Sequence, residues 1–160
     1  MLNSLKRATE TQRHRGTPFF FCLCVSVTLW LVSAMAQDKP APTRNVWDGV
    51  YSAKQAERGA VLFEDKCSSC HGSDMTGGPG VPSLAAPDFA FTWNNNRAGS
   101  LFMTLSGSMP LDAPGSLRTE QYIDLMAVIF KANNFPATEM TELPQTREAL
   151  DDILITRSKP

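Results

Sequence analysis

Two long stretches of this chain carry apolar residues at the spacing of an amphipathic helix. The first runs from Val50 to Lys66, with Ser52 as its expected N-cap. Gly59 lies at the edge of its apolar face, and a glycine inside a helix costs about 1 kcal/mol relative to alanine. We therefore expect the backbone of another helix to approach closely at Gly59. The face itself comprises Ala53, Ala56, Ala60 and Phe63.

The second stretch runs from Thr119 to Asn133 and has the stronger pattern. Thr119 is a suitable N-cap, and Glu120 suits the positive end of the helix dipole. We expect the apolar stripe of this helix to pack against the Gly59 face of the first. The stripe comprises Tyr122, Leu125, Met126, Ile129 and Phe130.

Three shorter stretches complete the expected architecture. Residues 98–106 predict a short helix, and residues 72–87 are rich in glycine and proline and predict an irregular loop. Residues 143–155 predict a last short helix. It is expected to pack back through Leu150, Ile153 and Leu154. The pattern therefore favours an all-α domain.

Residues 1–36 have the features of a secretory signal peptide. A basic segment precedes an apolar run from Phe19 to Val32, which is too short to span a membrane comfortably. Ala34-Met35-Ala36 is an A-x-A cleavage site, so we expect cleavage before Gln37, export to the periplasm and no stable membrane span afterwards. An uncleaved anchor is the alternative, and it stays open.

The rest of the chain divides into a short arm and one domain. Residues 37–46 are polar, contain two prolines and predict a flexible N-terminal arm, whereas residues 47–160 have the length of a single domain. Loss of the signal would remove four basic residues and one acidic residue, changing the formal net charge from −1 to about −4. A negative domain argues against nucleic acid and mildly favours a partner with a positive docking face.

The segment Cys67-Ser68-Ser69-Cys70-His71 reads C-x-x-C-H, the attachment signature of a c-type haem. The two thiols add to the two vinyl groups of haem as thioethers, and the spacing puts both sulfurs on one turn of backbone. His71 follows directly, so its imidazole is placed to bind the iron as the proximal ligand. The motif predicts one covalently bound haem c per chain.

The two cysteines suit three alternative roles less well. A thioredoxin-like pair requires a βαβ context, which no predicted strand supplies here. A closed zinc site needs four ligands, and Cys67, Cys70 and His71 supply at most three. A disulfide between Cys67 and Cys70 would close a loop too short to remove much unfolded-chain entropy.

The loop from residue 72 to residue 87 is expected to hold His71 in place. A ligating imidazole needs an acceptor for its other ring nitrogen, which fixes the ring orientation and increases its basicity. We expect the carbonyl of Pro82 to be that acceptor, with Leu84 turned onto the haem face. The alternative, that the prolines of this segment merely stiffen the loop, stays equally open for any single residue.

The aromatic cluster from Phe89 to Trp93 is expected to line the haem pocket. Trp93 and Arg97 are candidate donors to a haem propionate, which is otherwise a costly buried charge. An equally good alternative is that Trp93 belongs to the core and that Arg97 is a solvated surface cation.

Met109 is the expected sixth ligand of the iron. Only His71 remains among the histidines once the signal is removed, so a second histidine ligand is excluded. Met109 precedes Pro110, which pushes it out of the helical region into an extended loop, and a loop allows its thioether to face an iron. Met103 lies in an apolar helical run and is expected in the core. Less suitable by position are Met75, Met126 and Met140.

A helix, C-x-x-C-H, the Pro82 loop, the Met109 loop and a closing helix follow one another in this order, and the chain resembles the small single-haem cytochromes c. The resemblance covers most of residues 37–160. It implies an all-α, cytochrome c-like fold with N- and C-terminal helices packed around one covalent haem. By position, the implied site residues are Cys67 and Cys70 for the thioethers, His71 and Met109 for the iron, and Pro82 for the carbonyl that holds the histidine.

The run from Trp93 to Leu117, with Met109-Pro110 and Pro114-Gly115-Ser116-Leu117, is similar to the cytochrome domains and partner cytochromes of quinoprotein (PQQ) alcohol dehydrogenases. Arg118 departs from that pattern, because those relatives usually begin the last helix with a small capping residue. The likeness implies periplasmic electron transfer from such a dehydrogenase to an oxidase or another cytochrome. A haem enzyme or gas-binding protein with an open distal site is the alternative.

Overall fold

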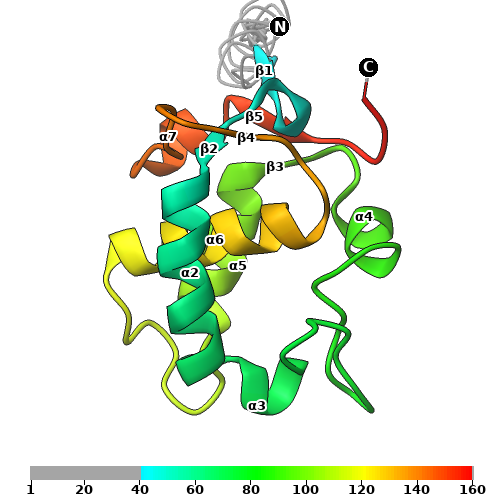
Figure 1. Ribbon diagram of the computed structural model, residues 1–160, viewed down its shortest axis with the longest axis vertical. Coiled ribbons are helices and arrows are strands. Elements are labelled where there is room, and N and C mark those ends of the chain that lie inside the picture. The colour runs from blue at the N-terminus through cyan, green and yellow to red at the C-terminus, as the bar shows by residue number, and fades with distance from the viewer. Residues whose placement is uncertain (1–40, 160) are drawn as a thin grey trace, which may run out of the picture. The chain divides into compact units, whose positions relative to one another are not determined.

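The computed structural model describes residues 41–159, and the predicted signal peptide, residues 1–36, lies outside that range. The described domain is mainly helical, as expected (Figure 1). Its helices are α2 (Ala53–Lys66), α3 (Ser68–His71), α4 (Asp88–Trp93), α5 (Ala98–Ser108), α6 (Thr119–Ala132) and α7 (Arg147–Leu150), with a 3₁₀ helix η1 (Val46–Asp48). Its strands are β1 (Arg44–Asn45), β2 (Tyr51–Ser52), β3 (Asn96–Arg97), β4 (Ala137–Thr138) and β5 (Ile153–Ile155). None of the helices in residues 41–159 is long and apolar enough to cross a membrane.

Helices α2 and α6 cross at Gly59, as the sequence predicted, with α6 running across α2 in Figure 1. A Cβ on residue 59 would overlap the carbonyl of Asp124 and would lie 3.2 Å from the Cβ of Val128. Because glycine has no Cβ, the two backbones come into contact at this point. The predicted cap of α2 is also present, since Ser52 Oγ accepts a hydrogen bond from the N–H of Gln55 at 3.0 Å.

The buried face of α2 differs from the prediction. Ala53 and Ala60 are exposed, whereas the side chain of Gln55 is buried. Burial of this amide is tolerated because its oxygen accepts from the N–H of Leu143 at 2.9 Å. That partner lies 88 positions away in the sequence, so the hydrophobic pattern of the helix cannot predict the contact.

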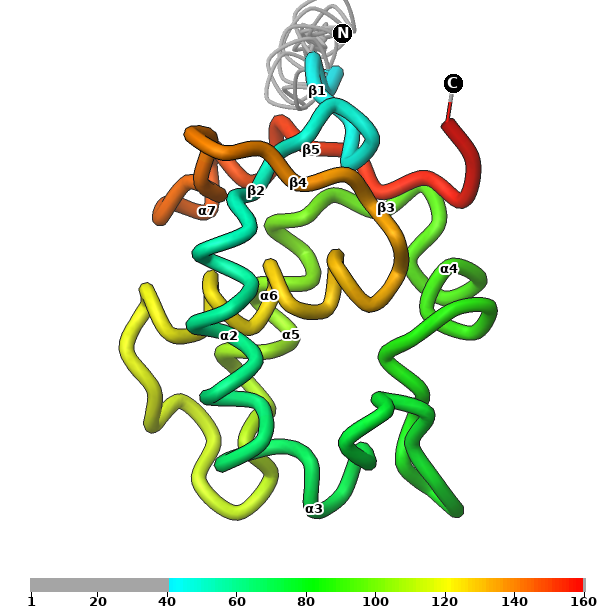
Figure 2. Tube along the Cα trace, in the orientation of Figure 1, coloured from blue at the N-terminus to red at the C-terminus, as the bar shows by residue number. Residues whose placement is uncertain are grey.

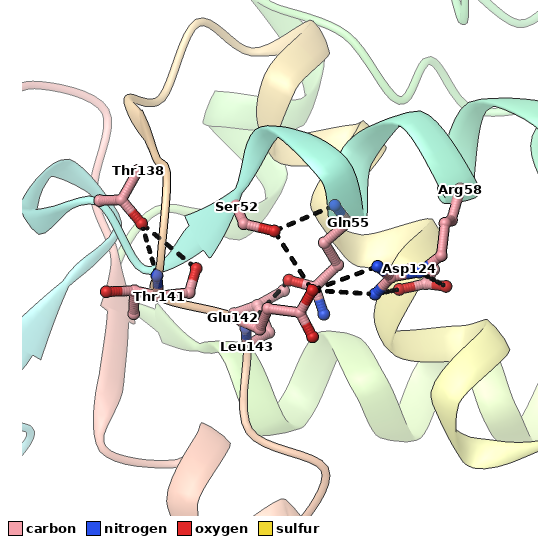
Figure 3. A network of polar contacts seen from close by, with 8 residues as sticks. All are labelled: Ser52, Gln55, Arg58, Asp124, Thr138, Thr141, Glu142 and Leu143. Carbon is pink, nitrogen blue, oxygen red and sulfur yellow. Dashed lines mark hydrogen bonds and ion pairs between the residues drawn. The ribbon is translucent and has the colours of Figure 1, made fainter.

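A polar network joins α2 to α6 and to the chain after β4 (Figure 3). Arg58 donates through Nε and Nη2 to the two carboxylate oxygens of Asp124, at 2.9 Å each, and through Nη2 to Glu142 Oε1 at 3.1 Å. Ser52 Oγ also donates to Glu142, at 3.3 Å. The hydrogen bond with Asp124 is the main cause that raises the pKa of Arg58 above its usual value. The network therefore fastens the segment around Glu142 to α2.

Helix α6 supplies more of the core than any other helix or strand of the described residues, and its predicted stripe is buried. Its N-cap is Arg118 rather than Thr119, because the N–H of Arg118 donates to Gln121 Oε1 at 2.9 Å. The side chain of Gln121, at the N3 position of a capping box, thus takes the place of the expected Thr119 hydroxyl. The largest fully buried side chains of the domain are Tyr51, Phe89, Phe130, Leu101, Ile123, Met126, Ile129, Leu150, Ile153, Ile155, Val46 and Val50.

Two small sheets, which the sequence did not predict, tie distant parts of the domain together. Strand β5 pairs in parallel with β1 and antiparallel with β3, and β2 pairs in parallel with β4. Arg44 pairs with Ile153, and Val46 is fully buried, so the predicted flexible arm over residues 37–46 is wrong at its C-terminal end. Strands of two or three residues show no alternating pattern, and β1 meets its partner more than 100 positions along the chain.

The end of the chain also differs from the prediction of one helix over residues 143–155. Helix α7 covers only Arg147–Leu150 and is followed by β5. Ile153 is buried as expected, but Ile155 is buried in place of Leu154. The reason is that alternate residues of a strand face the same side, so 153 and 155 share the buried face.

Candidate functional site

The C-x-x-C-H motif continues directly from the end of α2 (Figure 2). The N–H of Cys67 donates to the carbonyl of Phe63 at 2.8 Å, so Cys67 still takes part in the hydrogen bonding of α2. The N–H of His71 in turn donates to the carbonyl of Cys67 at 3.0 Å. Both thiols and the imidazole are therefore carried by a single turn at the end of a helix that α6 holds in place.

Cys67 and Cys70 are both free thiols, the first half-buried and the second exposed. Burial raises the pKa of Cys67 to about 11, with a further contribution from the neighbouring Cys70, so the Cys67 thiol is protonated at neutral pH. Within residues 41–159, no three side chains among the histidines, cysteines and acids are placed to hold one metal ion.

The ring of His71 is buried and oriented by residues 72–87, which we call the His71 loop. Nδ1 of His71 lies 3.0 Å from the carbonyl oxygen of Pro82, the residue expected to supply this acceptor. A carbonyl oxygen only accepts, so Nδ1 carries the proton and Nε2 has the free lone pair that a metal requires. The loop is tied to His71 a second time, because the N–H of Gly77 donates to the His71 carbonyl at 2.8 Å.

Gly77 is a site residue that the sequence motifs did not indicate. Its φ is 71°, and a Cβ there would lie 2.8 Å from the carbonyl carbon and 2.9 Å from the carbonyl oxygen of Pro82. Glycine alone combines this φ with so close an approach of the acceptor. The glycine-rich composition of the loop was visible in the sequence, but nothing local distinguishes Gly77 from Gly78, whose Cβ would meet no atom within 4 Å.

Leu84, expected on the haem face, is half-buried, and its backbone is bonded on both sides. Its N–H donates to the carbonyl of Met75, and its carbonyl accepts from Nδ2 of Asn133, each at 2.8 Å. Asn133 ends α6, and its Nδ2 also donates to the carbonyl of Ile129 at 2.8 Å. From the sequence, Asn133 was expected only as the last residue of the helix, whereas the structure makes it an anchor for the His71 loop.

The aromatic cluster divides between two faces of α4. Phe89 is buried and half-buried Trp93 tilts against it, with ring centroids 6.2 Å apart, because residues four apart share a helix face. Phe91 lies between them in sequence and was expected to join the cluster. It is 79% exposed and does not pack with the other two rings. Arg97 donates from Nη1 to the carbonyl of Asp151 at 2.8 Å, beside the small sheet. The interactions proposed for Trp93 and Arg97 with a propionate stay predictions.

Met109 is half-buried at the end of α5, with an extended backbone at φ −125° and ψ 152°, as expected before a proline. We call residues 109–118 the Met109 loop. Figure 2 shows it, in yellow-green, on the opposite side of α3 from the His71 loop, in green. The N–H of Met109 donates to the carbonyl of Leu105 at 3.0 Å, and its carbonyl accepts from the hydroxyl of Tyr122 at 2.8 Å.

The other methionines occupy different environments. Met126 is fully buried in α6, as expected. Met103 is 45% exposed, so the expectation that it belongs to the core is wrong. Leu101 and Leu105 are four residues apart and form the buried face of α5, and Met103, halfway between them, turns away from that face.

Residues 54–128 match the family described as Cytochrome C oxidase, cbb3-type, subunit III. Neither a curated protein nor a solved structure gave a significant match. The matched region begins in α2, contains the C-x-x-C-H motif and Met109, and ends in α6. The match supports a c-type cytochrome with a cytochrome c-like fold and a covalently bound haem c. The donor set suits that group, since two free thiols stand on one turn beside an imidazole whose Nδ1 is already hydrogen-bonded.

Proposed function

We propose that this protein is a periplasmic electron carrier in which Cys67 and Cys70 hold haem c and His71 and Met109 are the axial ligands of its iron. The observation that carries the proposal is the 3.0 Å contact between His71 Nδ1 and the Pro82 carbonyl. Metal-ligating histidines characteristically donate through their other ring nitrogen in this way. When bound, haem c supplies the one-electron couple of its iron.

Each of these side chains has a separate task. The two cysteines keep the group from dissociating, and the Pro82 carbonyl fixes the imidazole and increases its basicity. The Met109 thioether is a soft ligand that favours ferrous iron and raises the potential. With His71 and Met109 both holding the iron, no coordination position would be left for a substrate, which is what an electron carrier requires.

The periplasmic location rests on the predicted signal peptide. The basic segment, the apolar run from Phe19 to Val32 and the Ala34-Met35-Ala36 site together favour export by the general secretion route. The test is N-terminal sequencing of the protein purified from the periplasm. Cleavage before Gln37 supports the proposal, whereas an intact N-terminus in the membrane fraction supports the retained anchor instead.

The proposed electron donor is a quinoprotein alcohol dehydrogenase, with an oxidase or another cytochrome as acceptor. The similarity of the Trp93–Leu117 run to cytochromes of those enzymes supports the donor. Cys70 is exposed, so the end of the domain at α3 is where a partner would come nearest to the redox centre. The interface should be small, because a carrier has to leave quickly.

The family description favours a second candidate, a subunit of a terminal oxidase, since the matched family is named for subunit III of such an enzyme. The two candidates differ in the protein with which they exchange electrons rapidly. A soluble carrier is reduced quickly by the dehydrogenase, whereas an oxidase subunit copurifies with its oxidase and delivers electrons within the complex.

An optical spectrum tests the ligation. A low-spin, six-coordinate haem with the weak sulfur-to-iron charge-transfer band of the ferric state is the expected result. A high-spin, five-coordinate spectrum would overturn the carrier function and favour a haem enzyme or gas binder.

Stopped-flow mixing tests the partner. The ferric protein is mixed with the reduced dehydrogenase of the same organism at several ionic strengths. We expect rapid reduction at a rate that falls as salt rises, because a negative domain is steered to a positive docking face. If no reduction occurs at any salt concentration, the dehydrogenase is not the donor. If reduction is fast and its rate does not depend on salt, only the electrostatic steering is rejected.

A further inference from the structure

The hydroxyl of Tyr122 bonds to both ends of the Met109 loop. It donates to the carbonyl of Met109 at 2.8 Å and accepts from the N–H of Leu117 at 3.4 Å. Tyr122 is 3% exposed and lies in the first half of α6, the helix at the centre of the core. A group fixed in the core thus holds the point where the loop begins and the point where it returns.

Between buried Pro110 and half-buried Leu117, which packs against the core, the Met109 loop is open to solvent. Residues 111–116 are all exposed, and its internal backbone bonds are local, from Ala113 to Pro110 at 3.0 Å and from Ser116 to Ala113 at 3.2 Å. Such bonds shape the turn but do not fix its position relative to the core. The backbone of Arg118, where the loop enters α6, also bonds to Gln121, but the hydroxyl of Tyr122 is the group of α6 that bonds back to Met109 at the start of the loop.

Both backbone groups of Met109 are therefore held by helices. Its N–H is bonded to Leu105 of α5 and its carbonyl to Tyr122 of α6. With the backbone fixed on both sides, the thioether can move only by rotation of its own side chain. Release of the carbonyl would allow the whole residue to swing outward with the exposed loop.

We propose that Tyr122 is a positioning residue for the sixth ligand, and that its hydroxyl limits the fraction of molecules in which Met109 has left the iron. This inference rests on the proposed axial role of Met109. An added ligand such as cyanide binds only to that open fraction, so its apparent affinity reports the opening equilibrium directly. Loss of the hydrogen bond to the Met109 carbonyl should raise the open fraction about three- to tenfold.

The chain contains a matched control for this experiment. Of its two tyrosines, Tyr51 is also buried, and its hydroxyl also donates to a backbone carbonyl, that of Phe135, at 2.7 Å. Tyr122→Phe and Tyr51→Phe each delete one buried hydroxyl and keep the ring. The edge-to-face packing of ring 122 on Phe102, at 6.4 Å between centroids, should survive the change.

The experiment measures cyanide affinity and the sulfur-to-iron band of the ferric holoprotein for the wild type and both variants, with urea unfolding of each. We expect Tyr122→Phe to raise the apparent cyanide affinity about three- to tenfold, with Tyr51→Phe unchanged although it loses similar stability. Equal effects of the two variants, or no effect of Tyr122→Phe, would overturn the inference while the wild-type band upholds Met109 ligation. A wild type without the band would overturn both.

Discussion

The His71 loop and the Met109 loop each carry a proposed iron ligand, but they are held in different ways. The His71 loop bonds largely to itself and to the motif, through Gly77 to the His71 carbonyl, Leu84 to Met75, and His71 to Pro82. The Met109 loop is exposed over residues 111–116 and is held mainly at its ends. Its holding groups belong to α5 and α6.

This difference predicts unequal behaviour of the two ligands. The acceptor for His71 lies 11 positions away in the chain, so the imidazole is oriented within one local unit that also contains the cysteines. Met109 depends on the packing of separate helices and on one hydroxyl of the core. The thioether should therefore be the ligand that is released and replaced first, while the imidazole stays in place.

The largest expected effect comes from removing the attachment points. Cys67→Ser combined with Cys70→Ser should leave little folded protein, because a domain of this size depends on the haem as part of its core. Ser69→Ala, in the same turn, is the control and should accumulate normally. Acid–organic extraction of the wild type should leave the colour with the polypeptide. Haem that passes into the organic phase would contradict covalent attachment.

Breaking the Met109 side should change the iron without unfolding the domain. Met109→Ala should abolish the sulfur-to-iron band, lower the reduction potential and admit cyanide or imidazole. Met103→Ala is the control and should keep the band, with a loss of stability below about 1 kcal/mol because Met103 is 45% exposed. Redox titration and the ferric spectrum measure both. A band that persists in Met109→Ala and is lost in Met103→Ala would reassign the ligand.

Breaking the His71 side should have a smaller effect on the iron. Gly77→Ala puts a Cβ against the Pro82 carbonyl at a positive φ, so we expect a loss of about 1–3 kcal/mol in the free energy of unfolding. Displacement of the acceptor should make the imidazole less basic and raise the reduction potential. Gly78→Ala, where a Cβ meets nothing within 4 Å, should change neither quantity. Identical results for the two variants would remove Gly77 from the site.

The smallest effect is expected far from both loops. Hydrogen bonds from the hydroxyl and the N–H of Thr43 lower the pKa of Asp152, with help from the charges of Arg44 and Arg97. A lowered folded-state pKa stabilises the fold above the unfolded value of about 3.9, and that contribution is lost as pH falls through the folded value. Asp152→Asn should therefore be slightly less stable than the wild type at neutral pH, and the two proteins should converge in acid.

Urea unfolding at a series of pH values measures this difference. The sulfur-to-iron band at neutral pH should be the same in both proteins, because the carboxylate of Asp152 bonds to Thr43, which belongs to neither ligand loop. A constant gap between the two stability curves at every pH would show that the carboxylate charge makes no contribution.

Much of the fold was predictable wherever a signal is local. The periodicity of α2 and α6 and the cap at Ser52 follow from residues within one or two turns of each other, and a glycine inside the pattern of α2 indicated a close approach at position 59. The extended backbone of Met109 follows from the proline beside it. The predictions were wrong where a residue distant in the sequence determines the burial of a side chain, as at Gln55, whose burial depends on Leu143.

The sequence by itself determined the chemistry of this protein, because thiol spacing, an adjacent imidazole and a methionine before a proline are properties of covalently neighbouring residues. The sequence also predicted the Pro82 carbonyl as the acceptor for His71. Only the tertiary structure decided which other groups hold the proposed ligands in place: Gly77 against Pro82, the amide of Asn133 and the hydroxyl of Tyr122. The hydrogen bonds of Asn133 and Tyr122 join residues 49 and 13 positions apart, and no local pattern encodes such contacts.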